Sequence, residues 1–229
     1  MQKLIKILLS YAVICSMSLV YANDPVIPKV DDMNKQVPKV NKNLQKKEMP
    51  SDKLYEKKHN LLLLDNLLTG NKRNIDHLLR NENVKFIEHD VQNHIEISDD
   101  IDFIFHFASA ASPIAYQENP VNTLKAGSIG TINPLGLAKV KKADYLLAST
   151  SEIYGDPEIH PQTEEYKGAV SINGPRACYD EGKRCAETLF WDYKRQHDVD
   201  VKVVRIFNTY GPRMQKNDGR VVSNFIVQA

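Results

Sequence analysis

Short apolar runs that each stop at polar residues are the feature that most constrains this fold. Segments with helical spacing lie between them, at about 71–82, 121–142 and 179–196. Strands that alternate with helices predict βαβ units and a parallel sheet covered on both faces. The expected fold class is therefore α/β with a doubly wound parallel sheet. The five predicted strands are 61–64, 84–87, 101–108, 145–148 and 201–207.

Composition excludes several classes of protein. Hydrophobic content of 42%, charged content of 26% and a net charge of +1 are typical of an ordinary soluble domain. The balanced charge gives no reason to expect nucleic acid as a partner or electrostatic attachment to a membrane. Cys178 and Cys185 are separated by two helical turns, roughly 10 Å, which is too far for a disulfide.

The N-terminus has the features of a targeting signal. Lys3 and Lys6 precede an apolar run at 7–20, and small residues follow it. This pattern predicts a signal peptide or a signal-anchor over residues 1–22, with the rest of the chain in a lumen. A buried core helix is the alternative, but it would need a polar face. Residues 23–50 contain four prolines and no period, which predicts a disordered stem before a domain at 51–229.

Polar side chains gather at the carboxyl ends of the predicted strands, which form the ligand edge of an open parallel sheet. An acidic residue at the place of Asp65 can bind the ribose hydroxyls of NAD and would repel the 2′-phosphate of NADP. Each such residue could also simply cap a loop; together they favour a cofactor site. The residues are Asp65, Asp90, Ser112, Thr150, Glu152 and Asn208.

Tyr179 and Lys183 are four residues apart, so on a helix they share one face. An ammonium beside a phenol favours the phenolate, so we expect a lowered pKa for Tyr179 and a base usable near neutral pH. The alternative is a solvated helix face, because this spacing is common by chance.

Several longer strings occur together, and from about residue 61 onwards they resemble the extended short-chain dehydrogenases, which have a Rossmann-like fold. Within that group the chain is similar to the UDP-glucuronate decarboxylase family. A related epimerase or dehydratase is disfavoured by the strings at 207–214 and 218–225. The matching strings are LDN and TG at 64–70, HDV at 89–91, ASP at 111–113, STSEIYGDP at 149–157, HPQ at 160–162, CYDEGKRCAETL at 178–189, RIFNTYGPRM at 205–214 and DGRVVSNFIVQA at 218–229.

The resemblance implies roles for particular residues. Tyr179 would be the base, supported by Lys183 and assisted by Thr150 and Glu152, and no metal is expected. UDP-glucuronate would contact Tyr116, Asn208, Arg213 and Arg220. The resemblance also implies a homodimer through the helices at 121–142 and 179–197, and placement in the Golgi lumen. NAD would be held by Asp65, Asn66, Thr69, Gly70, Asp90, Val91, Ala108, Tyr179 and Lys183.

The chain also departs from the family pattern. Its first glycine is Gly70, so no glycine-rich turn precedes Asp65. We therefore expect the first strand, the turn that cradles the pyrophosphate and most of the C-terminal substrate region to be lacking. The family has asparagine at the position of Gly127 and a residue other than proline at Pro134. Two readings stay open: an NAD-dependent decarboxylase, or a catalytically inactive relative that pairs with an intact family member.

Overall fold

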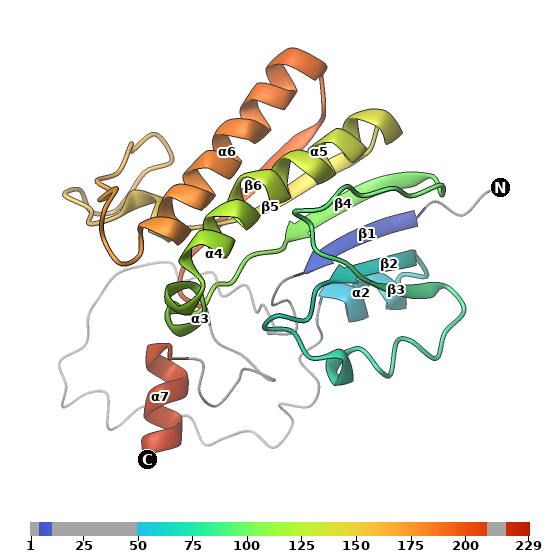
Figure 1. The fold of residues 1–229 in the computed structure, drawn as a ribbon, viewed down its shortest axis with the longest axis horizontal. Coiled ribbons are helices and arrows are strands. Elements are labelled where there is room, and N and C mark those ends of the chain that lie inside the picture. The colour runs from blue at the N-terminus through green and yellow to red at the C-terminus, as the bar shows by residue number, and fades with distance from the viewer. Residues whose placement is uncertain (1–4, 11–49, 210–218) are drawn as a thin grey trace.

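The structure is a computed structural model of the 229-residue chain, and it describes residues 5–10, 50–209 and 219–229. Six strands form one parallel sheet in the order β3-β2-β1-β4-β5-β6 (Figure 1). This order confirms the predicted doubly wound α/β class. The strands are β1 (Ile5–Ser10), β2 (Asn60–Asp65), β3 (Val84–Glu88), β4 (Ile101–Phe107), β5 (Asp144–Thr150) and β6 (Val201–Ile206).

Helices α4, α5 and α6 run side by side over one face of the sheet, while α2 lies on the other side (Figure 1). The predicted helix at 121–142 is two helices, because the chain breaks at Ser128, and α5 continues through the buried Pro134. The helices are α2 (Pro50–Glu56), α3 (Pro113–Glu118), α4 (Pro120–Gly127), α5 (Ile129–Lys141), α6 (Ala177–His197) and α7 (Val221–Gln228), with 3-10 turns η1 (Lys72–Asn74) and η2 (Ser151–Tyr154).

The expectation that the sheet lacks its first strand is wrong. β1 lies between β2 and β4 and pairs in parallel with both, with Ile7 opposite Leu62 and Ile104. A short apolar run is typical of a buried strand and of a signal sequence, so the composition of this segment does not distinguish a strand from a signal sequence. The rest of the predicted signal and nearly all of the predicted stem lie outside the described residues. Within the described ranges, no helix is long and apolar enough to cross a membrane.

β2 contains four consecutive leucines because both faces of the sheet are covered at this strand. Leu62 and Leu64 belong to the core beneath α5 and α6, whereas Leu61 and Leu63 belong to the opposite core. Successive side chains in a strand point to opposite faces, so burial on both sides removes the usual polar alternation. Each leucine that is fully buried contributes about 1.5–3 kcal/mol. These two layers fix the strand ends that carry the candidate site.

The predicted helix at 71–82 is wrong. Only η1 forms there, followed by turns. The Asn71 side chain accepts a hydrogen bond from the Arg73 backbone N–H, and the Asn81 amide donates to the Leu78 carbonyl. Such local side-chain bonds offer the backbone an alternative to the helical ladder.

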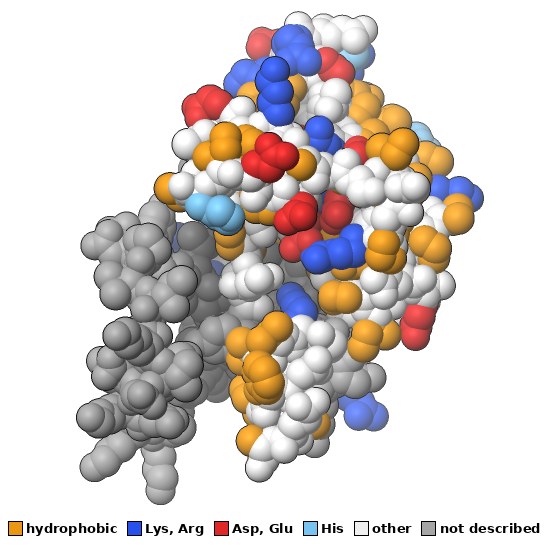
Figure 2. Space-filling model, turned by 90° about the vertical axis from the view of Figure 1, so that its left-hand side faces the viewer, with side chains coloured by type: hydrophobic (Ala, Val, Ile, Leu, Met, Phe, Trp, Pro, Cys, Tyr) orange, Lys and Arg blue, Asp and Glu red, His pale blue; other side chains and the backbone are white. Residues whose placement is uncertain are grey.

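Helix α7 exposes apolar side chains along most of its length. Figure 2 shows them gathered on one face of the molecule. Arg220 precedes the helix as its N-cap residue. The exposed residues are Val221, Val222, Phe225, Ile226 and Val227.

Candidate active site

Helix α6 presents three polar side chains, at four-residue intervals, to three consecutive residues at the end of β5. Tyr179 is hydrogen-bonded by the Thr150 side chain. Lys183 Nζ donates to the Ala148 carbonyl at 2.8 Å. Ser149 Oγ donates to Glu187 Oε1 at 2.5 Å. The helix period of 3.6 residues places such positions on one face, so the carboxyl end of β5 and one stripe of α6 form a single polar seam.

Tyr179 lies in a closed aromatic setting. Its ring stacks on the ring of Tyr116, with centroids 5.1 Å apart and planes inclined by 8°. Burial raises the pKa of Tyr179 to about 12, while the Thr150 hydrogen bond and the charge of Arg220 lower it less. The predicted lowering of this pKa is therefore wrong for the ligand-free protein. Removal of the phenol from water disfavours the phenolate by more than the neighbouring groups favour it.

Lys183 is also buried. Its Nζ lies 5.8 Å from the centroid of the Tyr179 ring, on the same helix face, as predicted. Burial lowers the pKa of Lys183 to about 8, and the carboxylate of Glu187 opposes this shift. The ammonium is thus largely retained near neutral pH but is close to its titration point.

Glu152 lies at the mouth of this seam, in η2. Its backbone N–H donates to Thr150 Oγ1 at 3.2 Å, and its carboxylate pairs with the guanidinium of Arg176. Arg176 is the N-cap residue of α6, three residues before Tyr179, and its side chain is half-exposed. Thr150, Glu152 and Tyr179, predicted to act together, are brought together by these contacts.

Two buried polar groups lie beside Tyr179. Asp180 Oδ1 has no hydrogen-bond partner among the described residues, and the Tyr116 hydroxyl is approached only by the guanidinium of Arg176. Burial raises the pKa of Tyr116, and it raises the pKa of Asp180 to about 6, an effect that Arg176 opposes and Glu181 adds to. Unsatisfied buried polar groups are rare and call for an explanation. Each group could accept a hydrogen bond from a bound sugar or donate one to it.

A second polar cluster lies at the ends of β2 and β3. Asp65 Oδ1 accepts from the Leu67 backbone N–H at 2.7 Å, and the Asn66 amide donates to Asp90 Oδ2 at 3.0 Å. A Cβ at Gly70 would lie 2.9 Å from Asp65 Oδ2, so a larger residue there would force the Asp65 carboxylate to shift. Acidic groups at this place in a doubly wound sheet bind ribose hydroxyls, so the cluster fits the adenosine end of a dinucleotide.

The other predicted residues are placed as follows. Val91 and Ala108 are buried at the ends of β3 and β4, and Thr69 is half-buried. Asn208 is exposed just beyond β6, and Arg213 lies outside the described residues. The residues that would cradle a pyrophosphate, between β1 and α2, also lie outside them. Among the described residues no cluster of metal-ligating side chains is found.

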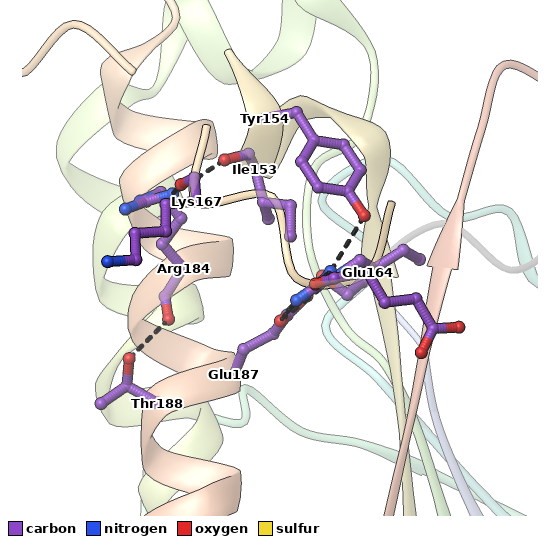
Figure 3. A network of polar contacts seen from close by, with 9 residues as sticks. Ile153, Tyr154, Glu164, Lys167, Arg184, Glu187 and Thr188 are labelled. Carbon is purple, nitrogen blue, oxygen red and sulfur yellow. Dashed lines mark hydrogen bonds and ion pairs between the residues drawn. The ribbon is translucent and has the colours of Figure 1, made fainter. Parts of the chain in front are cut away.

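A partly buried ion pair of Glu187 was not predicted from the sequence; Figure 3 labels Glu187 and its neighbour Tyr154. Arg205 of β6 binds the Glu187 carboxylate through Nε and Nη2, at 3.1 and 2.9 Å, and its Nη1 donates to the Tyr154 hydroxyl and the Glu164 carbonyl. Two signals in the sequence were available. Glu187 repeats the four-residue spacing of Tyr179 and Lys183, and an arginine follows two valines near the end of an otherwise largely apolar strand.

Residues 51–229 match the NAD dependent epimerase/dehydratase family, and the chain belongs to this family. Among the curated relatives, it is 58% identical over 179 residues to UDP-glucuronic acid decarboxylase 1 of Xenopus tropicalis, covering 78% of this chain and 42% of that protein. It is 54% identical to UDP-glucuronic acid decarboxylase 3 of Arabidopsis thaliana, covering 78% of this chain and 52% of the relative. The chain thus spans about half the length of these relatives.

Solved structures share the fold. UDP-glucose 4-epimerase from Thermotoga maritima superposes with a TM-score of 0.67 at 24% identity, covering 76% of this chain and 56% of that one. The dTDP-glucose 4,6-dehydratase from Bacillus anthracis, solved in complex with NAD, gives a TM-score of 0.64 at 18% identity. That alignment covers 93% of this chain and 57% of the dehydratase.

Proposed function

We propose that this chain carries the reacting residues of an NAD-dependent UDP-glucuronate decarboxylase, which forms UDP-xylose. The observation that carries the proposal is the seam in which Tyr179 meets Thr150 and Lys183 beneath Glu152. Support comes from the 58% identity to a UDP-glucuronic acid decarboxylase. When bound, NAD would supply a reversible hydride acceptor and a positive nicotinamide ring whose charge favours a phenolate.

The residues of the chain would perform the proton chemistry. Tyr179 takes the proton from the sugar 4-hydroxyl, while Thr150 holds the phenolic oxygen and Lys183 supplies positive charge. With the C4 hydride passed to the bound cofactor, the 4-keto group would be β to the carboxylate. The bond to the carboxylate carbon would then break, carbon dioxide would leave, and the bonding electron pair would stay on the sugar as an enolate. After C5 is protonated, return of the same hydride to C4 would restore the hydroxyl of UDP-xylose. Glu152 assists the proton movement that returns a proton to C5. A pKa of about 12 keeps Tyr179 protonated until its ligands bind.

The binding residues divide into four groups. Asp65, Asn66, Thr69 and Gly70 would hold the adenosine ribose, with Asp90 and Val91 beside the base and Ala108 and Lys183 at the nicotinamide end. Tyr116, Asn208 and Arg220 would contact the nucleotide sugar, together with Arg213. Two arginines suit a diphosphate because each offers a bidentate fork.

The second candidate function is a catalytically inactive relative that pairs with an intact family member. It is favoured by the sequence before Gly70, which contains no glycine for a pyrophosphate turn. Helices α4, α5 and α6 also expose large apolar side chains that a partner could cover: Val121, Leu124, Ile129, Ile132, Val140 and Trp191.

We propose that these helices form a homodimer interface. Apolar patches on adjacent helices are typical of subunit contacts. Trp191→Glu should convert a dimer into a monomer in light-scattering measurements. Ile172→Glu is the matched control, because Ile172 is 84% exposed and lies in a turn outside the three helices. A wild-type monomer at micromolar concentration would contradict the proposal. Placement in the Golgi lumen stays a prediction from residues 1–22.

One experiment separates the two functions. NAD is titrated calorimetrically into the full chain, UDP-glucuronate is added, and UDP-xylose is assayed. Micromolar NAD binding with product formation, lost in Tyr179→Phe while binding is kept, is the expected result. A folded chain that neither binds NAD nor forms product would overturn the enzyme and favour the partner-binding relative. Co-purification with a tagged, intact UDP-glucuronate decarboxylase would then test the pairing.

A further inference from the structure

The ion pair of Glu187 and Arg205 occupies a central position between the reacting residues and the segment 151–170. On one side, Glu187 accepts from Ser149, which lies between Ala148 and Thr150 in β5. These two neighbours bind Lys183 and Tyr179. Glu187 therefore forms the inner end of the polar seam.

On the other side, Arg205 reaches the segment 151–170. Its Nη1 donates to the Tyr154 hydroxyl at 2.9 Å and to the Glu164 carbonyl at 2.8 Å. Arg184, on α6, holds the same segment through the carbonyls of Ile153 and Lys167 (Figure 3). The segment begins with η2, which carries Glu152 next to the first of these anchor points.

The pair is partly buried, with Glu187 buried and Arg205 half-buried. The side chains of Glu187 and Arg205 are 8% and 24% exposed. Both carboxylate oxygens of Glu187 are used, and Arg205 distributes three nitrogens over Glu187, Tyr154 and Glu164. A buried pair with satisfied hydrogen bonds fixes geometry, and removal of one partner leaves an uncompensated charge.

We propose that Glu187 is a positioning residue for Tyr179 and Lys183, and that its salt bridge with Arg205 couples this pair to the segment that carries Glu152. The proposal rests on the proposed function for the roles of Tyr179, Lys183 and Glu152. Glu187 touches no reacting atom. It acts through the charge that it presents to Lys183 and through the arginine that it holds.

The first test is an NMR titration of the full, ligand-free chain labelled in its lysine side chains. Glu187→Gln keeps the shape of the side chain and removes its charge, so the titration midpoint of Lys183 should fall by about one pH unit. Lys183→Met assigns the resonance. Glu181→Gln is the matched control, because it removes an equal charge from the solvent-facing side of α6, where Glu181 pairs with Arg184 at 3.7 Å. The exposed Lys202 should titrate unchanged in both variants.

The second test is hydrogen exchange in the segment 151–170. The amides of Asp156 and Ala169 are bonded to the carbonyls of Ala169 and Tyr154. Arg205→Lys keeps the charge but loses the planar fork, so exchange at these amides should quicken at least about tenfold. Tyr154→Phe, which removes one hydroxyl of the network, should give a smaller increase.

The outcomes are separable. A purely structural Glu187 would quicken exchange in Glu187→Gln and leave the Lys183 midpoint where Glu181→Gln leaves it; that result overturns the positioning role. Unchanged exchange in Arg205→Lys overturns the coupling. If Glu187→Gln does not fold, Ser149→Ala replaces it, since it removes one of the two hydrogen bonds that Glu187 Oε1 accepts and should also move the Lys183 midpoint. Both readouts are taken without ligand, so failure of NAD binding would not affect them.

Discussion

Gly127 of α4 lies directly against the backbone of Gly182 in α6. A Cβ at Gly127 would come within 2.6 Å of the Gly182 carbonyl oxygen, so α4 and α6 touch through their backbones there. Gly182 is three residues after Tyr179 and one before Lys183, on the helix that carries both. The asparagine that the family pattern has at this position would not fit the present helix spacing.

Gly127→Ala should therefore destabilise the fold by about 1–3 kcal/mol, because the added methyl group forces the two backbones apart. Gly136→Ala is the matched control within α5, since a Cβ there meets no atom within 4 Å. That substitution should stabilise the protein by about 0.5–1 kcal/mol through helix propensity. Urea denaturation of the two variants measures both effects. Equal stabilisation by the two alanines would contradict the close approach.

Acid should destabilise the protein through His106. Its ring is buried, its Nδ1 lies 2.7 Å from the Tyr145 hydroxyl, and burial, helped by the charge of Lys183, lowers its pKa from 6.5 to about 3. A lowered folded-state pKa contributes stability that is present above pH 6.5 and is lost as the pH falls towards 3. The free energy of unfolding should fall across that window. The double variant His106→Phe/Tyr145→Phe should lose this dependence, while Tyr145→Phe alone should keep it.

Asp180 should make the free energy of unfolding depend on pH with the opposite sign. Burial raises its pKa from 3.8 to about 6, so its contribution to stability is present below pH 3.8 and is lost as the pH rises through 6. Asp180→Asn should gain stability relative to wild type as the pH rises from 4 to 7. Asp192→Asn, at an exposed position of α6, should show no such trend. Denaturation curves at several pH values test the comparison, and parallel curves for Asp180→Asn and wild type would contradict it.

The place of β1 predicts slow hydrogen exchange near the N-terminus. Residues 6–9 pair with β2 on one side and β4 on the other. Their amides should exchange on the timescale of these two strands, because an amide in the centre of a sheet opens only with the sheet. Exchange of residues 6–9 at the rate of an unfolded chain, with β2 and β4 still protected, would show that β1 does not occupy the sheet in solution.

Much of the architecture could be predicted because strands that are buried on both faces of the sheet appear in the sequence as continuous apolar runs. The apolar runs predicted five strands within a few residues of their observed ends, and the spacing of Tyr179 and Lys183 predicted their common face. The sign of the pKa shift of Tyr179 could not be predicted, since it depends on how completely Tyr116 and its neighbours exclude water. The link from Glu187 to Arg205 likewise needs the β5–β6 pairing before the two residues meet.

β1 was missed for a different reason. A signal sequence and a buried strand can both consist of an apolar run near lysines. Only the neighbouring strands with which the run pairs show that it is a strand. The partners of Ile5–Ser10 lie more than fifty residues away along the chain, in β2 and β4. The sequence near the N-terminus therefore favoured a signal sequence, which can be predicted without knowing any pairing strand.

In this chain the match to the family and the parallel sheet begin at different residues. Sequence likeness to the family begins at residue 51, whereas the sheet begins at Ile5. A strand bounded on both sides by parallel neighbours is held through main-chain groups, so many apolar sequences can serve there. Loss of the N-terminal segment would therefore leave β2 and β4 without the strand that lies between them, although this segment is outside the family match.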